Sequence, residues 1–321
     1  MSSFFCPAPW KSLYSHTNEM AVCCVSTRKF KMSPKEFLAS EYLTELREKF
    51  LKGEVDDTCS RCVDAEKNGL HSIRKHFLER HGNSTTEKLD YIELRASNLC
   101  NFQCKMCGPD SSSLIAGSIN TVTDSNWKEI LELSDNLKSL NLTGGEPFLI
   151  KQYYELLDHL IEKNRTDIKL KIYTNCSTYN PIFIKKILKF RSVLHLSIDG
   201  IGATAQLQRT GTDWDTVNSN ILKFIKLPVG IVFHTTFTSL NITDVFALSK
   251  YFIEMNKLKS KLFFVAHSVD DSHELNLLSL DHESKRVAID NITNSLEILK
   301  DECFIKFKDE LISIKKMLEY H

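Results

Sequence analysis

The sequence has no excess charge, no long apolar run and no targeting segment. Its 41 basic residues are balanced by 41 acidic ones, which argues against a nucleic-acid partner because duplex binding needs concentrated positive charge. No stretch approaches the roughly 18 consecutive apolar residues of a membrane-spanning helix. The N-terminal residues Met1–Cys6 have neither the basic start nor the apolar core of a signal peptide. We therefore expect a soluble, cytoplasmic protein with no membrane partner.

Cysteine is the residue type that the sequence does supply. In an intracellular chain, ten cysteines indicate metal sites rather than disulfides. Only Cys176 and Cys303 stand apart from the others. The rest form two groups, an N-terminal set and a compact run: Cys6, Cys23, Cys24, Cys59 and Cys62, then Cys100, Cys104 and Cys107.

From Asp90 onward, short β-rich runs alternate with amphipathic helical runs, which predicts an α/β fold with a parallel sheet. Such sheets carry their chemistry at the carboxyl ends of the strands. The expected strands are 91–95, 137–142, 168–173, 193–198, 230–238 and 261–266. The expected helices are 111–118, 126–133, 151–163, 182–189, 214–226 and 243–256.

The two ends of the chain differ from this central part, which we place at residues 88–280. In the tail, 281–321, apolar residues recur at steps of three and four and predict two helices that pack on the core or form a lid. In residues 1–82, Ser33-Pro34-Lys35-Glu36 predicts a capped helix start. A second helix is expected from Ser40 to Lys52, ended by Gly53. This N-terminal segment is too small to be stable without a cross-link such as a bound metal.

The compact run has the spacing C-x3-C-x2-C at Cys100, Cys104 and Cys107. Three thiolates can hold three irons of a four-iron cluster and leave the fourth iron open for chemistry. A three-cysteine zinc loop is the alternative, although the loop contains no histidine as a further ligand. The next expected strand ends in Gly144-Gly145-Glu146-Pro147, where glycines permit close backbone approach and Glu146 offers a carboxylate to an ammonium group.

Together these two motifs resemble the radical S-adenosylmethionine (SAM) superfamily. The phrase from Asn98 to Cys107 is similar to the branch that carries SPASM or twitch domains, with Met106 where an aromatic residue is usual. The resemblance implies a partial (β/α)6 TIM-type barrel. It also implies that a reduced 4Fe-4S cluster cleaves SAM to a 5′-deoxyadenosyl radical that abstracts hydrogen from a substrate. Phe102 and Met106 are expected to contribute to the cofactor site, together with Gly144, Gly145 and Pro147.

Further cofactor contacts follow from the same resemblance. Glu146 is expected to accept hydrogen bonds from the SAM amine. Thr174-Asn175 matches a Thr-Asn pair of the family, and Ser197 matches a polar site near the ribose. Arg209 matches an arginine that pairs the SAM carboxylate, which suits a guanidinium fork. Cys176 stands where the family often has glycine, and we expect a small buried residue there.

The N-terminal cysteines look like a twitch domain, the shortened SPASM module that binds one auxiliary 4Fe-4S cluster. We expect Cys6, Cys24, Cys59 and Cys62 as its ligands. Cys23 and Cys24 point oppositely on an extended segment, so only one readily serves, and the resemblance to twitch modules, through their spacing from the first cysteine, implies Cys24. Zinc is the alternative metal because four thiolates also suit it. Twitch modules usually follow the barrel, whereas this one precedes it.

The leading functional hypothesis is oxidative modification of a peptide or protein by a radical SAM oxidoreductase. A second is dehydrogenation or rearrangement of a small molecule such as an aminocyclitol, sugar or nucleoside. A third, from a different class, is a non-catalytic iron–sulfur electron-transfer or binding protein, against which residues 144–147 and Arg209 argue. The resemblance also implies a reductase, flavodoxin or ferredoxin as electron donor.

Overall fold

The computed structural model describes residues 4–67, 71–259, 261–269 and 274–320. Its main sheet has the strand order β10-β9-β7-β6-β5-β3-β1-β2, in which only β2 runs antiparallel to its neighbour. The six strands expected from the sequence are present, and the α/β fold with a partial barrel is confirmed. They are β3 (Tyr91–Arg95), β5 (Ser139–Leu142), β6 (Lys169–Thr174), β7 (Arg191–Ser197), β9 (Gly230–Phe237) and β10 (Leu262–Ser268).

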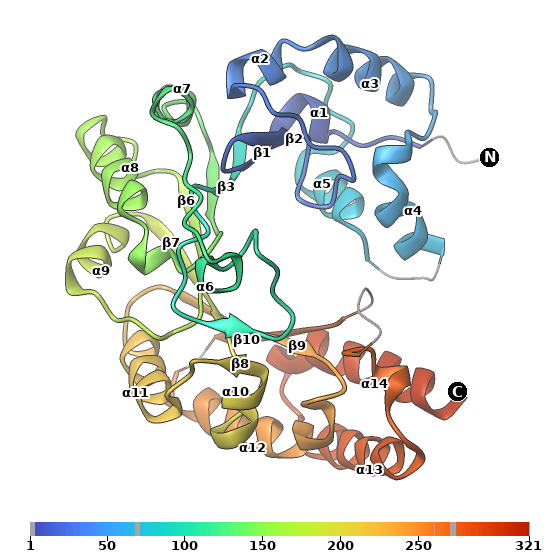
Figure 1. Cartoon of the computed structure of the whole chain (residues 1–321). Helices are drawn as coiled ribbons and strands as arrows, with labels where there is room; N and C mark the ends of the chain where they lie inside the picture. The colour runs from blue at the N-terminus through green and yellow to red at the C-terminus, as the bar shows by residue number, and fades with distance from the viewer. Residues whose placement is uncertain (1–3, 68–70, 260, 270–273, 321) are drawn as a thin grey trace.

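Helices cover the outer face of the curved sheet, and both termini lie on the same side of the molecule (Figure 1). The six expected helices all form, while α10 (Gly202–Gln208) was not predicted. Three-residue 3-10 turns lie at 147–149, 242–244, 277–279 and 302–304. The expected helices are α6 (Ser113–Ala116), α7 (Asp124–Ser134), α8 (Lys151–Glu162), α9 (Pro181–Ile187), α11 (Trp214–Ile225) and α12 (Val245–Leu258).

Alternation along the strands sends apolar side chains outward and polar ones inward. In β3, Ile92 and Leu94 are fully buried, while Glu93 between them lines the interior of the partial barrel. In β6, Leu170 is likewise buried and Lys171 lines the interior. The helices thus pack on an apolar outer face, and the inner face is left polar.

The N-terminal segment extends the same sheet. Strand β1 (Ser12–His16) pairs in parallel with β3, and β2 (Glu19–Ala21) adds an antiparallel edge. Neither strand was predicted, because β1 is short and gains its neighbours only in the folded chain. The division at residue 82 stays a prediction.

The expected N-terminal helices form as α2 (Pro34–Leu38) and α3 (Glu41–Leu51). Ser33 and Glu36 exchange side-chain and backbone hydrogen bonds in a complete capping box. Gly53 then adopts a left-handed φ of 76° after α3. The remaining helical elements of this segment are α1 (Ala8–Lys11), a 3-10 turn η1 (Asp57–Cys59), α4 (Ser60–Lys67) and α5 (Ile73–His81).

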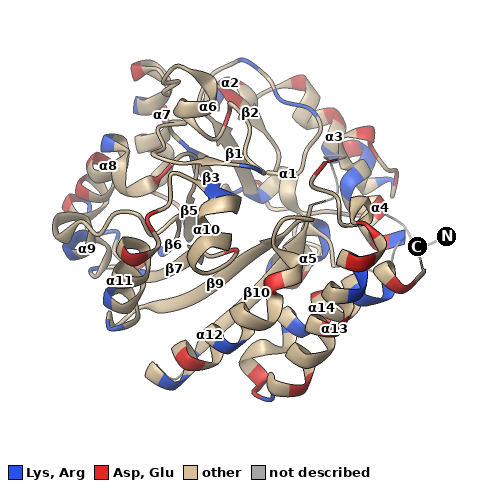
Figure 2. Ribbon diagram, turned by 60° about the horizontal axis from the view of Figure 1, so that its bottom comes forward, with Lys and Arg blue, Asp and Glu red and all other residues tan. Residues whose placement is uncertain are grey.

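The two tail helices are confirmed as α13 (His282–Ile298) and α14 (Ile305–Tyr320), which contact α12 and β10 respectively. Basic and acidic residues are interspersed over the outer helices in the view of Figure 2. Among the described residues, no helix combines the length and the apolar character needed to cross a membrane.

A candidate active site at the carboxyl ends of the strands

The three-cysteine loop follows β3 and borders a cavity of about 590 Å³. A two-residue strand, β4 (Gln103–Cys104), pairs antiparallel with β8 (Arg209–Thr210) and sets Cys104 opposite Arg209. All three thiols line the cavity, as expected for a cluster that faces a substrate space: Cys100, Cys104 and Cys107.

The thiols of this loop influence one another strongly. The hydrogen bond with Cys104 lowers the pKa of Cys107 to about 7, while the same hydrogen bond and burial raise the pKa of Cys104. Burial raises the pKa of Cys100 to about 11. Such groups bind metal as thiolates, so metal binding here releases protons.

The glycines of the Gly-Gly-Glu-Pro motif fit against the cysteine loop. A Cβ on Gly145 would lie 2.0 Å from the Leu99 carbonyl oxygen, and one on Gly144, whose φ is 110°, would lie 2.6 Å from that of Ser97. The Gly145 amide also donates to the Ser97 carbonyl at 3.0 Å. The glycines line the cavity, but their lack of side chains is required by the neighbouring loop, which the sequence could not reveal.

Glu146 faces the protein rather than the cavity. Its carboxylate accepts hydrogen bonds from the Thr174 hydroxyl at 2.7 Å and from the backbone amides of Asn175 and Phe148 at 2.7 and 3.2 Å. Burial raises its pKa to about 7 despite these donors. Glu146 is fully buried and does not line the cavity. Its carboxylate ties the end of β5 to the end of β6, and this geometry gives no support to the expectation that it receives the SAM amine.

Thr174, Asn175 and Ser197 line the cavity, and their expected contacts to the cofactor stay a prediction. The Asn175 amide donates to Asn101 at 3.1 Å and lies 3.8 Å from the Cys100 sulfur. Cys176, which does not line the cavity, is fully buried with a left-handed φ of 63°. Glycine adopts this left-handed conformation at little cost, whereas a residue with a Cβ is strained by it. This gives a physical reason for the glycine that the family often has here.

Arg209 lies at the cavity wall in a buried ion pair. Its Nε is 2.7 Å from Asp199 Oδ2, and the side chains are 14% and 0% exposed. Its Nη1 lies 3.8 Å from the Cys104 sulfur. Burial lowers its pKa, but the charge of Asp199 outweighs this and raises it overall. Asp199 was missed as a site residue because only the fold brings it to Arg209.

Of the three other residues expected at the cofactor site, one lines the cavity and two do not. Met106 lines the cavity, whereas Phe102 and Pro147 do not. Phe102 is buried beneath the loop, within 3.4 Å of the position of a Cβ on Gly211. Phe102 and Pro147 thus support the loops that carry the site.

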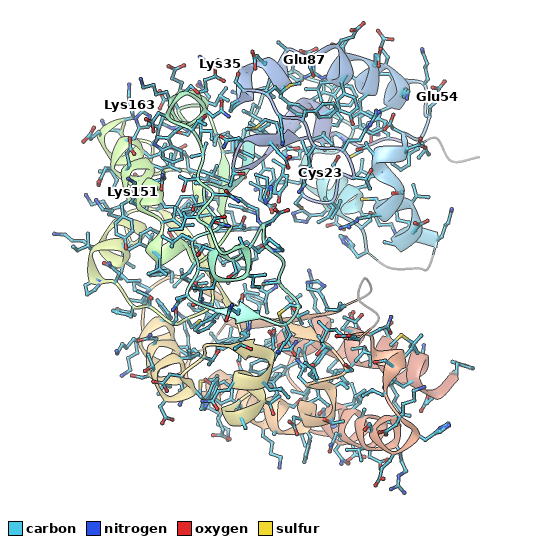
Figure 3. All side chains as sticks on the ribbon, in the orientation of Figure 1. Cys23, Lys35, Glu54, Glu87, Lys151 and Lys163 are labelled. Atoms are coloured by element: carbon cyan, nitrogen blue, oxygen red, sulfur yellow. The ribbon has the colours of Figure 1, made fainter. Side chains whose placement is uncertain are left out.

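The N-terminal cysteines gather around a second, small cavity of about 20 Å³. Four cysteines line this small cavity: Cys6, Cys23, Cys59 and Cys62. A hydrogen bond between the Ser26 and Thr58 hydroxyls holds the segments of Cys23 and Cys59 together. Burial raises the pKa of Cys6, Cys23 and Cys59 to about 12. Cys23 lies beside α5 and also lines the larger cavity, so it stands in the wall between the two (Figure 3).

Cys24, the ligand that the spacing favours, lies elsewhere. It lines the larger cavity and not the smaller one. Burial and the adjacent Glu93 carboxylate raise the pKa of the Cys24 thiol well above its usual value. The structure thus brings Cys23, not Cys24, to the other three cysteines, because the turn after β2 directs Cys24 into the barrel interior.

The polar interior of the partial barrel below the cysteine loop was not predicted from the sequence either. The signal was present in the alternation of β3 and β6, where every second residue is polar. Polar side chains of β3, β5 and β6, with two from α5, line the cavity: Tyr91, Glu93, Arg95, Asn141, Lys171, Tyr173, His76 and Arg80. Among the described residues, no three His, Cys, Asp or Glu side chains lie together as ligands of a single metal ion.

Comparisons with known proteins agree with the motifs. A model of the Radical SAM superfamily matches residues 94–252. A GTP 3′,8-cyclase of Campylobacter fetus is 30% identical over 89 residues, which cover 27% of this chain and 27% of that protein. The radical SAM cyclopropyl synthase TigE of Paramaledivibacter caminithermalis is 26% identical over 165 residues, or 46% of this chain and 35% of that one.

Solved structures also resemble the chain. The anSMEcpe structure with bound AdoMet has a TM-score of 0.49 at 22% identity and covers 64% of this chain and 59% of that one. Streptococcus suis SuiB bound to S-adenosylmethionine has a TM-score of 0.48 at 16% identity, covering 88% and 70%.

On the strength of the superfamily match and the motifs that it spans, this chain belongs to the radical SAM superfamily of enzymes. The match includes the cysteine loop, residues 144–147 and Arg209.

Proposed function

We propose that the protein cleaves SAM reductively at the Cys100–Cys107 loop and oxidatively modifies a peptide or protein substrate in the adjoining cavity. The observation that carries this proposal is the convergence of three thiols, Asn175, Ser197 and Arg209 on one cavity of about 590 Å³. That volume lies within the range usual for ligand sites. A non-catalytic electron carrier has no need of such a space beside its cluster.

The residues of the loop fit a cluster with one open iron. Three thiols supply three ligands, and Asn175 and Arg209 place N–H groups near Cys100 and Cys104, which stabilises thiolate charge. When bound, the cluster and SAM supply one-electron cleavage to a 5′-deoxyadenosyl radical. The remaining work of the chain is to orient the cofactors and exclude water.

We also propose that Cys6, Cys23, Cys59 and Cys62 hold an auxiliary 4Fe-4S cluster in a twitch-like module. The Arg74 guanidinium supports this, because it donates to the Phe5 carbonyl at 3.0 Å and its positive charge lowers the pKa of Cys6 and Cys62, although burial raises both overall. Four thiolates also suit zinc, but among the described residues no three such side chains lie close enough together to bind a single ion, which favours the larger cluster over zinc.

One other class of substrate, a small molecule, is the alternative to a peptide or protein. The chain spans about a quarter of the length of the GTP 3′,8-cyclases that it matches. The cyclase activity of those relatives favours a small molecule, such as a nucleoside, as the alternative to a peptide. A reductase, flavodoxin or ferredoxin as electron donor and a cytoplasmic location both stay predictions.

The test is anaerobic reconstitution followed by reduction with dithionite in the presence of SAM. We expect slow formation of 5′-deoxyadenosine, measured by chromatography, even without substrate. The Cys100→Ala, Cys104→Ala, Cys107→Ala triple variant is the matched control and should form none. If the loaded wild-type protein also forms none, the electron-carrier alternative gains and the proposal is wrong.

A further inference from the structure

A row of side chains crosses the inner face of the sheet below the cysteine loop. Strand register places Tyr14 beside Glu93, Glu93 beside Asn141, and Asn141 beside Lys171. All four line the 590 Å³ cavity. Since neighbouring strands are about 4.8 Å apart, Glu93 and Lys171 are separated by roughly 10 Å, with Asn141 between them.

Lys171 has no ion pair and no hydrogen bond through its ammonium group within the described part of the chain. Arg80, from α5, approaches it from across the cavity. The Arg80 guanidinium donates to the Ser139 hydroxyl at 2.7 Å and lies 5.2 Å from the centre of the Tyr91 ring, with no carboxylate partner. Burial, with the charge of Arg80 next, lowers the pKa of Lys171 to about 8.

Positive charge exceeds negative charge in this part of the cavity. Glu93 is the only carboxylate among the described lining residues, and its Oε2 already accepts the Tyr91 hydroxyl at 2.9 Å. Arg209 is neutralised by Asp199, but Lys171 and Arg80 are not neutralised. Lys169 and Lys306 add further positive charge around Lys171. Both cations are only partly buried, and an anionic ligand between them would supply the counter-charge that the lining side chains lack.

We propose that the substrate carries a carboxylate or phosphate group that binds between Lys171 and Arg80. This inference rests on the proposed function and names the chemistry of its substrate. Lys171 lies on β6, four residues before Asn175, which directly follows that strand, so the anionic group would be roughly 13 Å from the SAM-binding end of the cavity. The substrate therefore presents its reacting C–H bond near the cysteine loop and its anionic end to the floor.

The test uses two simple anions as probes, inorganic phosphate and glutarate, at constant ionic strength. Each is titrated calorimetrically into the full, reconstituted and oxidised protein without SAM or reductant. We expect saturable binding to the wild type, weakened at least tenfold in both Lys171→Met and Arg80→Met and retained in Lys171→Arg. Lys189→Met is the matched control, because Lys189 is exposed and does not line the cavity; its affinity should stay within about twofold of wild type.

Preference for phosphate would identify a phosphorylated substrate, and preference for glutarate a carboxylate such as an acidic side chain or a peptide C-terminus. Iron content and circular dichroism identify any variant that fails to fold, and Arg80→Met tests the site from a different element. Absence of saturable binding, or equal affinity in wild type, Lys171→Met and Arg80→Met, overturns the inference. Failure of SAM cleavage would leave this measurement unaffected, so the two proposals fail separately.

Discussion

The two cysteine sites of this protein are built in different ways. The radical SAM site takes its three thiols from one short loop, which pairs with β8 through β4, and opens into a cavity of about 590 Å³. The N-terminal site draws four cysteines from separate segments around a cavity of about 20 Å³, closed by Phe4, Phe50 and Phe77. An open site suits chemistry on a bound molecule, and a closed one suits storage or transfer of electrons or structural support.

The two sites also differ in their polar surroundings. Arg209 and Asn175 bring N–H groups to the thiols of the open site. At the closed site the surroundings are mainly apolar, and the nearby positive charge of Arg74 is paired with Glu66. The open site can therefore stabilise an additional charged ligand, whereas the closed site offers few polar groups to one.

The largest expected effect separates the sites by function. Wild-type protein should bind seven to eight irons, about the sum of two four-iron clusters. The triple alanine variant of Cys100, Cys104 and Cys107 should lose about half of this iron and all SAM cleavage. The matched Cys6→Ala, Cys59→Ala, Cys62→Ala variant should lose the other half and still cleave SAM. A wild-type count near four irons with one zinc would contradict the auxiliary cluster and leave the open site intact.

The next largest effect tests whether Cys23 or Cys24 is the metal ligand at the closed site. Cys23→Ala should reduce bound iron by up to half, because Cys23 lines the small cavity with the other three cysteines. Cys24→Ala should keep the wild-type iron content, because its thiol faces Glu93 in the barrel interior. Iron analysis and the absorbance of the reconstituted variants measure both. The reverse result would restore the ligand that the sequence spacing favours.

Arg209→Ala should weaken SAM binding about thirtyfold, since loss of a buried charged partner costs on the order of 2–5 kcal/mol. It should also destabilise the fold by about 3 kcal/mol, because Asp199 loses its counter-ion. The Arg209→Ala, Asp199→Asn double variant should recover much of the stability and none of the affinity. Calorimetry with oxidised protein measures the affinity; a value within about threefold of wild type would show that Arg209 serves Asp199 alone.

The smallest expected effect on SAM binding is that of Glu146→Gln. Because Glu146 does not line the cavity, affinity should change less than about threefold. Its carboxyl has a usual pKa of 4.5, raised by burial to about 7 in the native protein. The native state therefore holds the proton more tightly, so its stabilising contribution is full below pH 4.5 and is lost as pH rises through 7.

Denaturant unfolding from pH 4.5 to 7.5 checks this sign. Wild-type protein should lose stability relative to Glu146→Gln over this range, by on the order of 3 kcal/mol. A parallel pH dependence in the two proteins would mean that Glu146 is ionised throughout. A large loss of SAM affinity would instead place the carboxylate at the cofactor.

The sequence by itself determined the parts of this protein that depend on neighbours in the chain. The six alternating strands, the capping box at Ser33 and the spacing of Cys100, Cys104 and Cys107 are local patterns. Each follows from a period or a spacing that the backbone geometry fixes.

Only the tertiary structure decided the contacts between distant segments. It turned Glu146 toward β6, paired Arg209 with Asp199, joined β1 to β3, and placed Cys23 rather than Cys24 among the other N-terminal cysteines. The direction of a side chain at the end of a strand depends on turn geometry and on what packs against it, and neither is encoded in the spacing of residues. For the same physical reason, the unpaired charges of Lys171 and Arg80 became visible only once two distant elements lined one cavity.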